Sequence, residues 1–107
     1  MADERGIDSI IGADLDEELE EELKEPEMYT VVLHNDHYTT MEFVVSILRS
    51  IFHKPIFEAT KIMMDVHKKG KGVAGHYTYD IAATKVVQVR EKAKEYEYPL
   101  KCTVEKE

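Results

Sequence analysis

The acidic residues of this chain are concentrated in its first quarter, and this limits where a folded core can form. Residues 1–27 carry twelve Asp or Glu against two Lys or Arg, whereas residues 28–107 carry ten against twelve. Like charges three and four positions apart repel along a helix, and only Leu15, Leu19 and Leu23 offer an apolar stripe there. We therefore expect a flexible acidic extension at 1–26 and one folded domain at 27–107.

Composition narrows the class of protein further. The net charge of −8 over 107 residues disfavours binding to nucleic-acid phosphates or to an anionic membrane surface. No apolar run approaches the ~20 residues that span a bilayer, and the acidic N-terminus does not resemble a secretory signal. The single cysteine, Cys102, excludes an intramolecular disulfide and a cysteine-rich zinc module. We expect a protein of a reducing compartment, the cytoplasm.

Apolar periodicity in the remaining residues predicts strands and helices in the order β-α-α-β-α-β. A capping box of Thr39 and Glu42 begins the first helix, Pro55 suits the first turn of the second, and Gly70 lies just past its end. Thr78 caps the third helix. This order indicates an α+β domain with a small antiparallel or mixed sheet, covered on one face by helices. The predicted elements span 29–34, 39–52, 55–69, 73–77, 78–96 and 100–105.

The same periodicity predicts which helical residues face the core. These apolar positions are Met41, Val44, Val45, Leu48, Ile51, Phe52, Ile56, Ala59, Met63, Val66, Ile81, Ala82, Val86, Val89 and Ala93.

Four polar residues offer a candidate metal or hydrolytic site. His34, Asp36 and His37 are close in sequence, and His67 ends the second predicted helix beside its apolar face. Imidazole and carboxylate groups are ligands for zinc, but this spacing is unspecific. A surface, turn or capping role is the usual explanation for each of these residues. The lysine- and glycine-rich segment 68–72 lacks the spacing of a phosphate-binding loop and predicts a solvated turn.

One long segment is distinctive. Met28 to Val45, MYTVVLHNDHYTTMEFVV, resembles the opening of the bacterial ClpS family, which are adaptors for the ATP-dependent Clp protease. The resemblance covers residues 27–106 and implies a three-stranded antiparallel sheet with three helices. Further matches are Ala59-Thr60, Met63, Val66-His67, Gly70-Lys71-Gly72, Thr84-Lys85-Val86 and the segment from Pro99 to Glu105.

The resemblance implies an adaptor without catalytic activity, metal or cofactor. ClpS proteins bind substrate proteins whose first residue is Phe, Tyr, Trp or Leu, and deliver them to an unfoldase, ClpA or its relative ClpC. An N-terminal ammonium has three N–H donors and needs three acceptors. Asn35, Asp36 and His67 match the residues that bind it in the family. Because His67 must be neutral to accept, we expect binding to weaken as pH falls through about 6.5.

The resemblance also implies an apolar pocket for the first side chain. In the family the Met41 position excludes β-branched first residues. At the start of the third helix, Asp80 and Lys85 match positions that contact the N-terminal domain of the unfoldase, and the extension is thought to enter the unfoldase pore. The pocket residues that the resemblance assigns are Met41, Val44, Met63, Val66 and Leu100.

Two positions depart from the family pattern. His37 replaces a residue that is usually acidic, which removes one negative charge near the ammonium. Thr40 replaces a frequent Pro, which we expect to reduce stability only slightly. Two other functions remain open: the histidine-based site above, and a ribosome-associated interaction domain, since the C-terminal domain of the ribosomal stalk protein has a similar fold. Neither alternative explains Asn35 together with His67.

Overall fold

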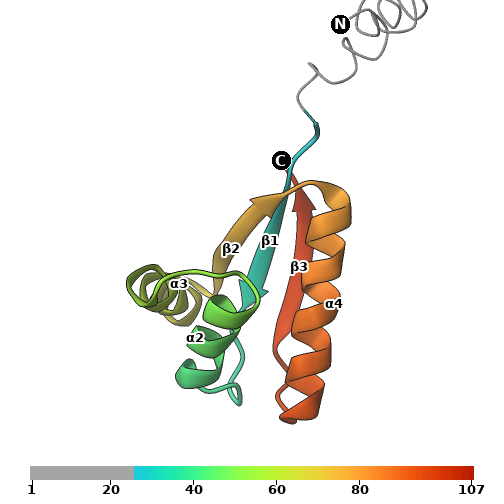
Figure 1. The fold of residues 1–107 in the computed structure, drawn as a ribbon. Coiled ribbons are helices and arrows are strands. Elements are labelled where there is room, and N and C mark those ends of the chain that lie inside the picture. The colour runs from blue at the N-terminus through green and yellow to red at the C-terminus, as the bar shows by residue number, and fades with distance from the viewer. Residues whose placement is uncertain (1–25) are drawn as a thin grey trace, which may run out of the picture.

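The computed structural model describes residues 26–107, which form three strands and three helices (Figure 1). This confirms the predicted α+β class and the order β-α-α-β-α-β. The predictions for residues 1–25, including the flexible extension and its leucine stripe, lie outside the described residues. The elements are β1 (Tyr29–His34), α2 (Met41–Ser50), α3 (Ile56–Lys69), β2 (Lys71–Tyr77), α4 (Tyr79–Glu95) and β3 (Lys101–Lys106).

The three strands form an antiparallel sheet in the order β2-β1-β3. Successive side chains of a strand point to opposite faces of the sheet. Val31 and Leu33 belong to the hydrophobic core, whereas Val32 is buried outside that cluster, on the opposite face. A register shift between Val31 and Val32 places Val31 opposite Gly75 and Val32 opposite Val73, which leaves Ala74 as an extra residue on β2.

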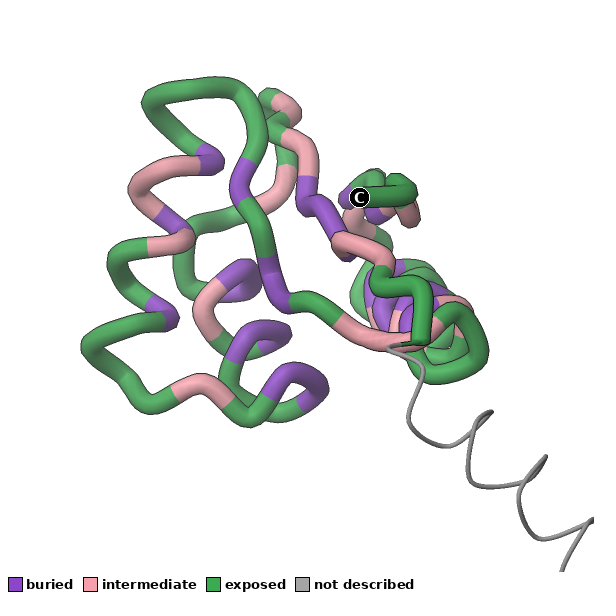
Figure 2. The backbone as a smooth tube through the Cα atoms, turned by 90° about the horizontal axis from the view of Figure 1, so that it is seen from above, coloured by how far each residue is buried: buried purple, intermediate pink, exposed green. Residues whose placement is uncertain are grey.

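The helices enclose the core against one face of this sheet. Helix α3 packs on β2, α4 packs on β3 and β1, and α2 packs against α3, as Figures 1 and 2 show. Figure 2 also shows that the buried residues lie where helices and strands face one another. The largest fully buried side chains are Leu33, Ile47, Leu48, Val31, Val89 and Cys102.

The predicted start of the first helix is wrong by one residue. Thr40, not Thr39, is the N-cap of α2, and its hydroxyl oxygen accepts a hydrogen bond from the backbone N–H of Phe43 at 3.1 Å. The Thr39 hydroxyl instead donates to Asp36 in the preceding turn. The buried face of α2 therefore differs from the predicted one. Met41 is 40% exposed, while Phe43 is buried against the rings of Tyr96 and Tyr98.

Other expectations need smaller corrections. Ile56 and Ile81 are exposed because each lies on the solvent-facing side of the first turn of its helix. Val45 is only half-buried at the edge of the core. Strand β2 begins at Lys71, two residues earlier than predicted, and the Thr78 side chain makes no capping hydrogen bond. Pro55 is the N-cap of α3 and precedes its first turn.

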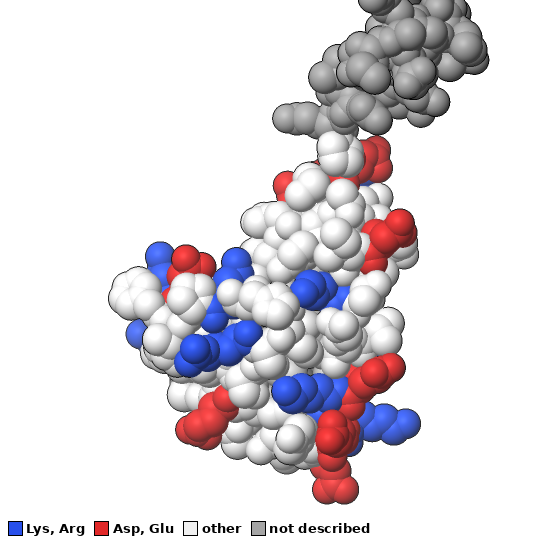
Figure 3. Space-filling model, in the orientation of Figure 1, with Lys and Arg blue, Asp and Glu red and all other residues white. Residues whose placement is uncertain are grey.

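Side chains of both signs are distributed over the surface shown in Figure 3, with uncharged surface between them. Within residues 26–107, no helix combines the length and the apolar character needed to cross a bilayer.

Candidate functional site

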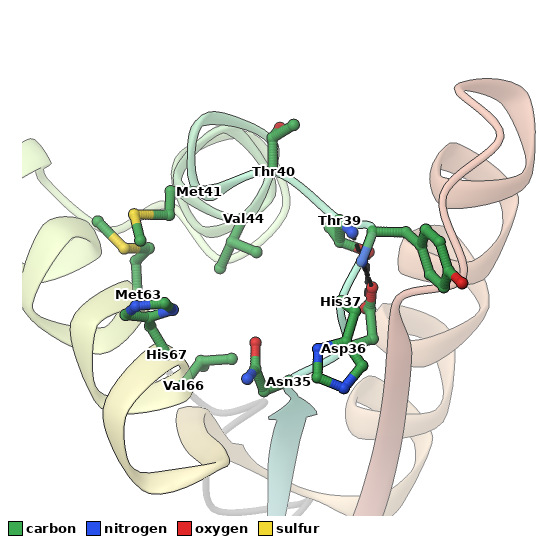
Figure 4. Close-up of a pocket in the computed structure, with 11 residues that line it drawn as sticks. Asn35, Asp36, His37, Thr39, Thr40, Met41, Val44, Met63, Val66 and His67 are labelled. Carbon is green, nitrogen blue, oxygen red and sulfur yellow. Dashed lines mark hydrogen bonds between the residues drawn. The ribbon is translucent and has the colours of Figure 1, made fainter.

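A cavity of about 410 Å³ opens between α2, α3 and the turn that joins β1 to α2 (Figure 4). Its volume falls in the range of about 300–1,000 Å³ that is usual for ligand pockets. Both polar and apolar side chains line the cavity. Its lining residues are Asn35, Asp36, His37, Tyr38, Thr39, Thr40, Met41, Val44, Met63, Val66 and His67.

A backbone hydrogen bond ties Asn35, at the end of β1, to the end of α3. Gly70 closes the helix with φ of 88°, a left-handed conformation that glycine adopts without strain. Its carbonyl oxygen accepts a hydrogen bond from the backbone N–H of Asn35 at 2.9 Å, which joins the end of β1 to the end of α3. His67 lies on the last turn of α3, three residues before Gly70. A strand end and a helix end therefore present both polar side chains to one cavity.

The apolar side of the cavity is formed by two helices. Val44 on α2 and Val66 on α3 are 5% and 3% exposed and point into the space, and Met63 is also buried. The Met41 and Met63 side chains lie along one wall in Figure 4, and Met41, 40% exposed, forms part of the rim. Thioether side chains adapt to apolar guests of varied shape.

Helix α3 approaches β2 closely because Gly72 has no side chain. A Cβ atom at Gly72 would lie 2.8 Å from Cγ2 of Val66 and 3.0 Å from the backbone oxygen of Ile62. The apolar wall of the cavity therefore depends on this glycine as well as on the residues that line it.

Asp36 holds together the turn between β1 and α2. Its Oδ1 accepts backbone N–H groups of Tyr38 at 2.8 Å and Thr39 at 2.7 Å, and its Oδ2 accepts the Thr39 hydroxyl at 2.7 Å. Partial burial raises the pKa of Asp36, but the hydrogen bonds from Thr39 and Tyr38 outweigh it, so the net pKa is lowered. A carboxylate has about four acceptor positions, so three bonds leave capacity for one more donor.

This arrangement suits a ligand with a hydrogen-bond donor next to an apolar group. Asn35, His67 and the remaining lone pair of Asp36 offer acceptors to the cavity. The two valines and two methionines offer apolar surface to the same space, and the His67 ring lies next to Met63 in Figure 4. Both Asn35 and His67 are exposed, so a ligand reaches them without unfolding the chain.

Seven of the residues that the resemblance assigns to the amine site or the apolar pocket line this cavity: Asn35, Asp36, Met41, Val44, Met63, Val66 and His67. Leu100 does not; it is buried in the core just before β3. The sheet order explains this difference, because β3 pairs with β1 on the edge away from β2 and α3. Asp80 is exposed in the first turn of α4.

Lys85 has contacts within the domain. Its Nζ donates to the backbone oxygen of Ile51 at 2.5 Å. It also lies 6.0 Å from the ring centroid of Phe52 and 5.7 Å from that of Tyr77. These contacts connect α4 to the end of α2, so Lys85 contributes to packing whatever else it binds.

Four lining residues were not assigned to the amine site or the apolar pocket: His37, Tyr38, Thr39 and Thr40. Of these, only His37 was a candidate site residue in the sequence, as part of the candidate metal site. All four follow the Asn35–Asp36 pair directly, and the three hydrogen bonds of Asp36 fold them around the opening. An Asp followed three residues later by Thr was the available sequence signal for this turn.

The geometry does not support the histidine-based metal site. In the part of the chain from residue 26 onward, no three His, Cys, Asp or Glu side chains converge as metal ligands. His34 instead contacts Thr103, with its Nε2 2.8 Å from the hydroxyl oxygen.

Comparison with known proteins identifies the family. The family model described as "ATP-dependent Clp protease adaptor protein ClpS" matches residues 24–103, which include every residue of the cavity. The chain belongs to the ClpS family. ClpS proteins are adaptors of the Clp protease, which agrees with the resemblance found in the sequence.

Individual relatives agree with this assignment. The ClpS adapter of Syntrophus aciditrophicus is 54% identical over 105 residues, covering 98% of each chain. That of Acetivibrio thermocellus is 56% identical over 86 residues, covering 80% of this chain and 87% of the relative. Agrobacterium tumefaciens ClpS2, solved bound to L-phenylalaninamide, superposes with a TM-score of 0.74 at 36% identity, covering 78% of this chain and all of that one.

Proposed function

We propose that this ClpS protein binds substrate proteins by a free N-terminal Phe, Tyr, Trp or Leu. The observation that carries the proposal is the cavity itself, in which acceptors from Asn35 and His67 adjoin an apolar surface. The ligand of the Agrobacterium ClpS2 structure, L-phenylalaninamide, has this combination of a primary amine beside an aromatic side chain. Binding proteins by their first residue requires no bond cleavage, so the protein acts as an adaptor without catalysing a reaction.

The polar side of the cavity recognises the amine. A free α-amino group has a pKa of about 7.7–8.0, so it is mostly an ammonium with three donors at neutral pH. Asn35 and His67 each accept one hydrogen bond, and Asp36 accepts the third directly or through water. Acetylation removes the charge and two of the three donors, which leaves acceptors without partners.

The apolar side recognises the first side chain. Val44, Met63 and Val66 form the base, and burying a Phe or Leu side chain there contributes about 1.5–3 kcal/mol. Hydrogen bonds to the charged ammonium add about 1.5–3 kcal/mol each. Met41 lies at the rim. From there its side chain disfavours Val and Ile, whose branched Cβ leaves less room than that of Phe or Leu. Leu100 supports this wall only indirectly, from the core.

Delivery requires a second surface. Asp80 and Lys85 on α4 contact the N-terminal domain of a ClpA- or ClpC-type unfoldase in the cytoplasm, and residues 1–26 precede the folded domain as a separate extension. Asp80 is exposed and free to bind. Replacing Lys85 would also disturb its packing against Phe52 and Tyr77. Asp80→Lys therefore tests unfoldase binding with less effect on the fold.

Fluorescence anisotropy tests the proposal with three labelled peptides. These begin with free Phe, acetylated Phe and free Ser. We expect tight binding of the free Phe peptide alone. Equal binding of all three, or binding of none, would overturn the proposal. The Asn35→Ala and His67→Ala variants then assign the amine site, with His76→Ala as a matched control because His76 is exposed and lies outside the cavity.

A further inference from the structure

The sheet has a second face that the helices leave open. Strand register places three rows of side chains on it: His34 lies between Lys71 and Lys101, Val32 between Val73 and Thr103, and Thr30 between His76 and Glu105. Val32 is buried although it lies outside the core cluster, and Val73 is 44% exposed. This face therefore has an apolar centre beside a basic row.

A groove of about 420 Å³ crosses this face and reaches the last turns of α3. Val32 and Val73 provide its apolar floor. Three lysines lie along it, Lys69, Lys71 and Lys106, against two carboxylates. Lys69 is paired with Asp65 at 3.5 Å, whereas Lys71 has no carboxylate partner within residues 26–107.

The pKa of His34 reflects which charges predominate around it. Partial burial lowers its pKa first, and Lys101 and Lys71 lower it further, while Glu105 acts in the opposite direction. Positive charge therefore exceeds negative charge at this end of the face.

The acidic segment of the same chain ends beside the groove, at Glu27. Glu27 pairs with Lys106 at 3.4 Å, and Lys106 lines the groove. Residues 13–25 contain eight Asp or Glu, one Lys, and the leucines Leu15, Leu19 and Leu23. Thirteen residues reach about 20 Å even as a helix, and a six-residue strand such as β1 also spans about 20 Å. The segment is therefore long enough to lie along the groove.

We propose that residues 13–25 bind the helix-free face of the sheet in the same molecule, with their leucines on Val32 and Val73 and their carboxylates facing Lys71 and Lys69. A short link gives a segment an effective concentration in the millimolar range, so weak contacts suffice. The substrate cavity, between α2 and α3, remains open in this state. A partner that binds the extension must displace it from the groove.

A spin label on the full-length chain tests this inference. Cys102 is fully buried with a pKa raised to about 12, so a thiol-directed nitroxide modifies only a cysteine introduced as Ala13→Cys. We expect the amide signals of Val32, His34 and Lys71, toward the end of the groove that residue 13 reaches, to lose at least about twofold in intensity relative to those of α4 at low salt. The loss should reverse at about 0.5 M salt, where charges are screened within ~5 Å.

Charge reversal supplies a matched control. Lys71→Glu should abolish the broadening, whereas Lys94→Glu, an equal charge change on the exposed surface of α4, should preserve it. An unchanged amide spectrum elsewhere confirms that both variants are folded. Broadening that is absent at low salt, spread evenly over the domain, centred on the substrate cavity, or unaffected by Lys71→Glu would overturn the inference. None of these outcomes depends on peptide binding, so the proposed function is tested separately.

Discussion

Replacing Gly72 by Ala tests how the cavity wall is held in place. The new methyl group would lie 2.8 Å from Cγ2 of Val66 and 3.0 Å from the backbone oxygen of Ile62. Neither neighbour yields easily, because valine has a stiff side chain and the other atom belongs to the backbone of α3. We expect α3 to move away from β2 and to carry Val66 and His67 with it.

The expected loss of stability follows from two opposing effects. Overpacking costs about 1–3 kcal/mol. Alanine in a strand regains about 0.5–1 kcal/mol relative to glycine. The net loss is about 1–2 kcal/mol, which lowers the urea midpoint by about 1 M for a slope near ~1.5 kcal/mol/M. Affinity for a Phe peptide should fall as well, because the wall and the amine acceptor move together.

Urea denaturation of four proteins completes the test: wild type, Gly72→Ala, Val66→Ala and the double variant. Removing Cγ2 of Val66 relieves one of the two close contacts. The double variant should therefore lose less unfolding free energy than the two single variants lose together, by at least about 0.5 kcal/mol. Strict additivity, or a Gly72→Ala protein as stable as wild type, would refute this account of the wall.

Three further predictions concern single side chains. His67→Ala should weaken binding of a Phe peptide at least about tenfold in a titration while changing stability by less than about 0.5 kcal/mol, because the residue is exposed; a large loss of stability would contradict this. The lowered pKa of Asp36 stabilises the fold above the unfolded value of about 3.9, so the advantage of wild type over Asp36→Asn should vanish as pH falls below about 4. Cys102, with its pKa raised from 9.0 to about 12, should resist a thiol reagent until urea unfolds the chain, and its contribution to stability should fall as pH rises through that interval.

The fold was predictable because local patterns agreed with one another. Alternating or β-branched residues marked β1 and β3, and Gly70 marked the end of α3 at the left-handed position that the structure shows. The pattern of β2 was weaker, and its start was predicted two residues late. The start of α2 was less predictable because Thr39 and Thr40 are both capable caps. A tertiary contact, the hydrogen bond from Thr39 to Asp36, decides between them.

The site was predictable only in part. Family resemblance identified seven lining residues, but it also included Leu100, which lies in the same core cluster without lining the cavity. The hydrogen bond from Asn35 to Gly70 connects positions 35 residues apart, and no local pattern reveals it. The close approach of Val66 to Gly72 likewise depends on how α3 crosses β2.

Backbone and side-chain NMR of the labelled protein tests the central claim most directly, with a Phe peptide added in its free and its acetylated form. The account predicts that the free peptide shifts signals of Asn35, His67, Val44 and Met63, and that the acetylated peptide shifts none of them. Equal shifts from both peptides, or shifts centred outside the cavity between α2 and α3, would contradict recognition of the N-terminal amine at this site.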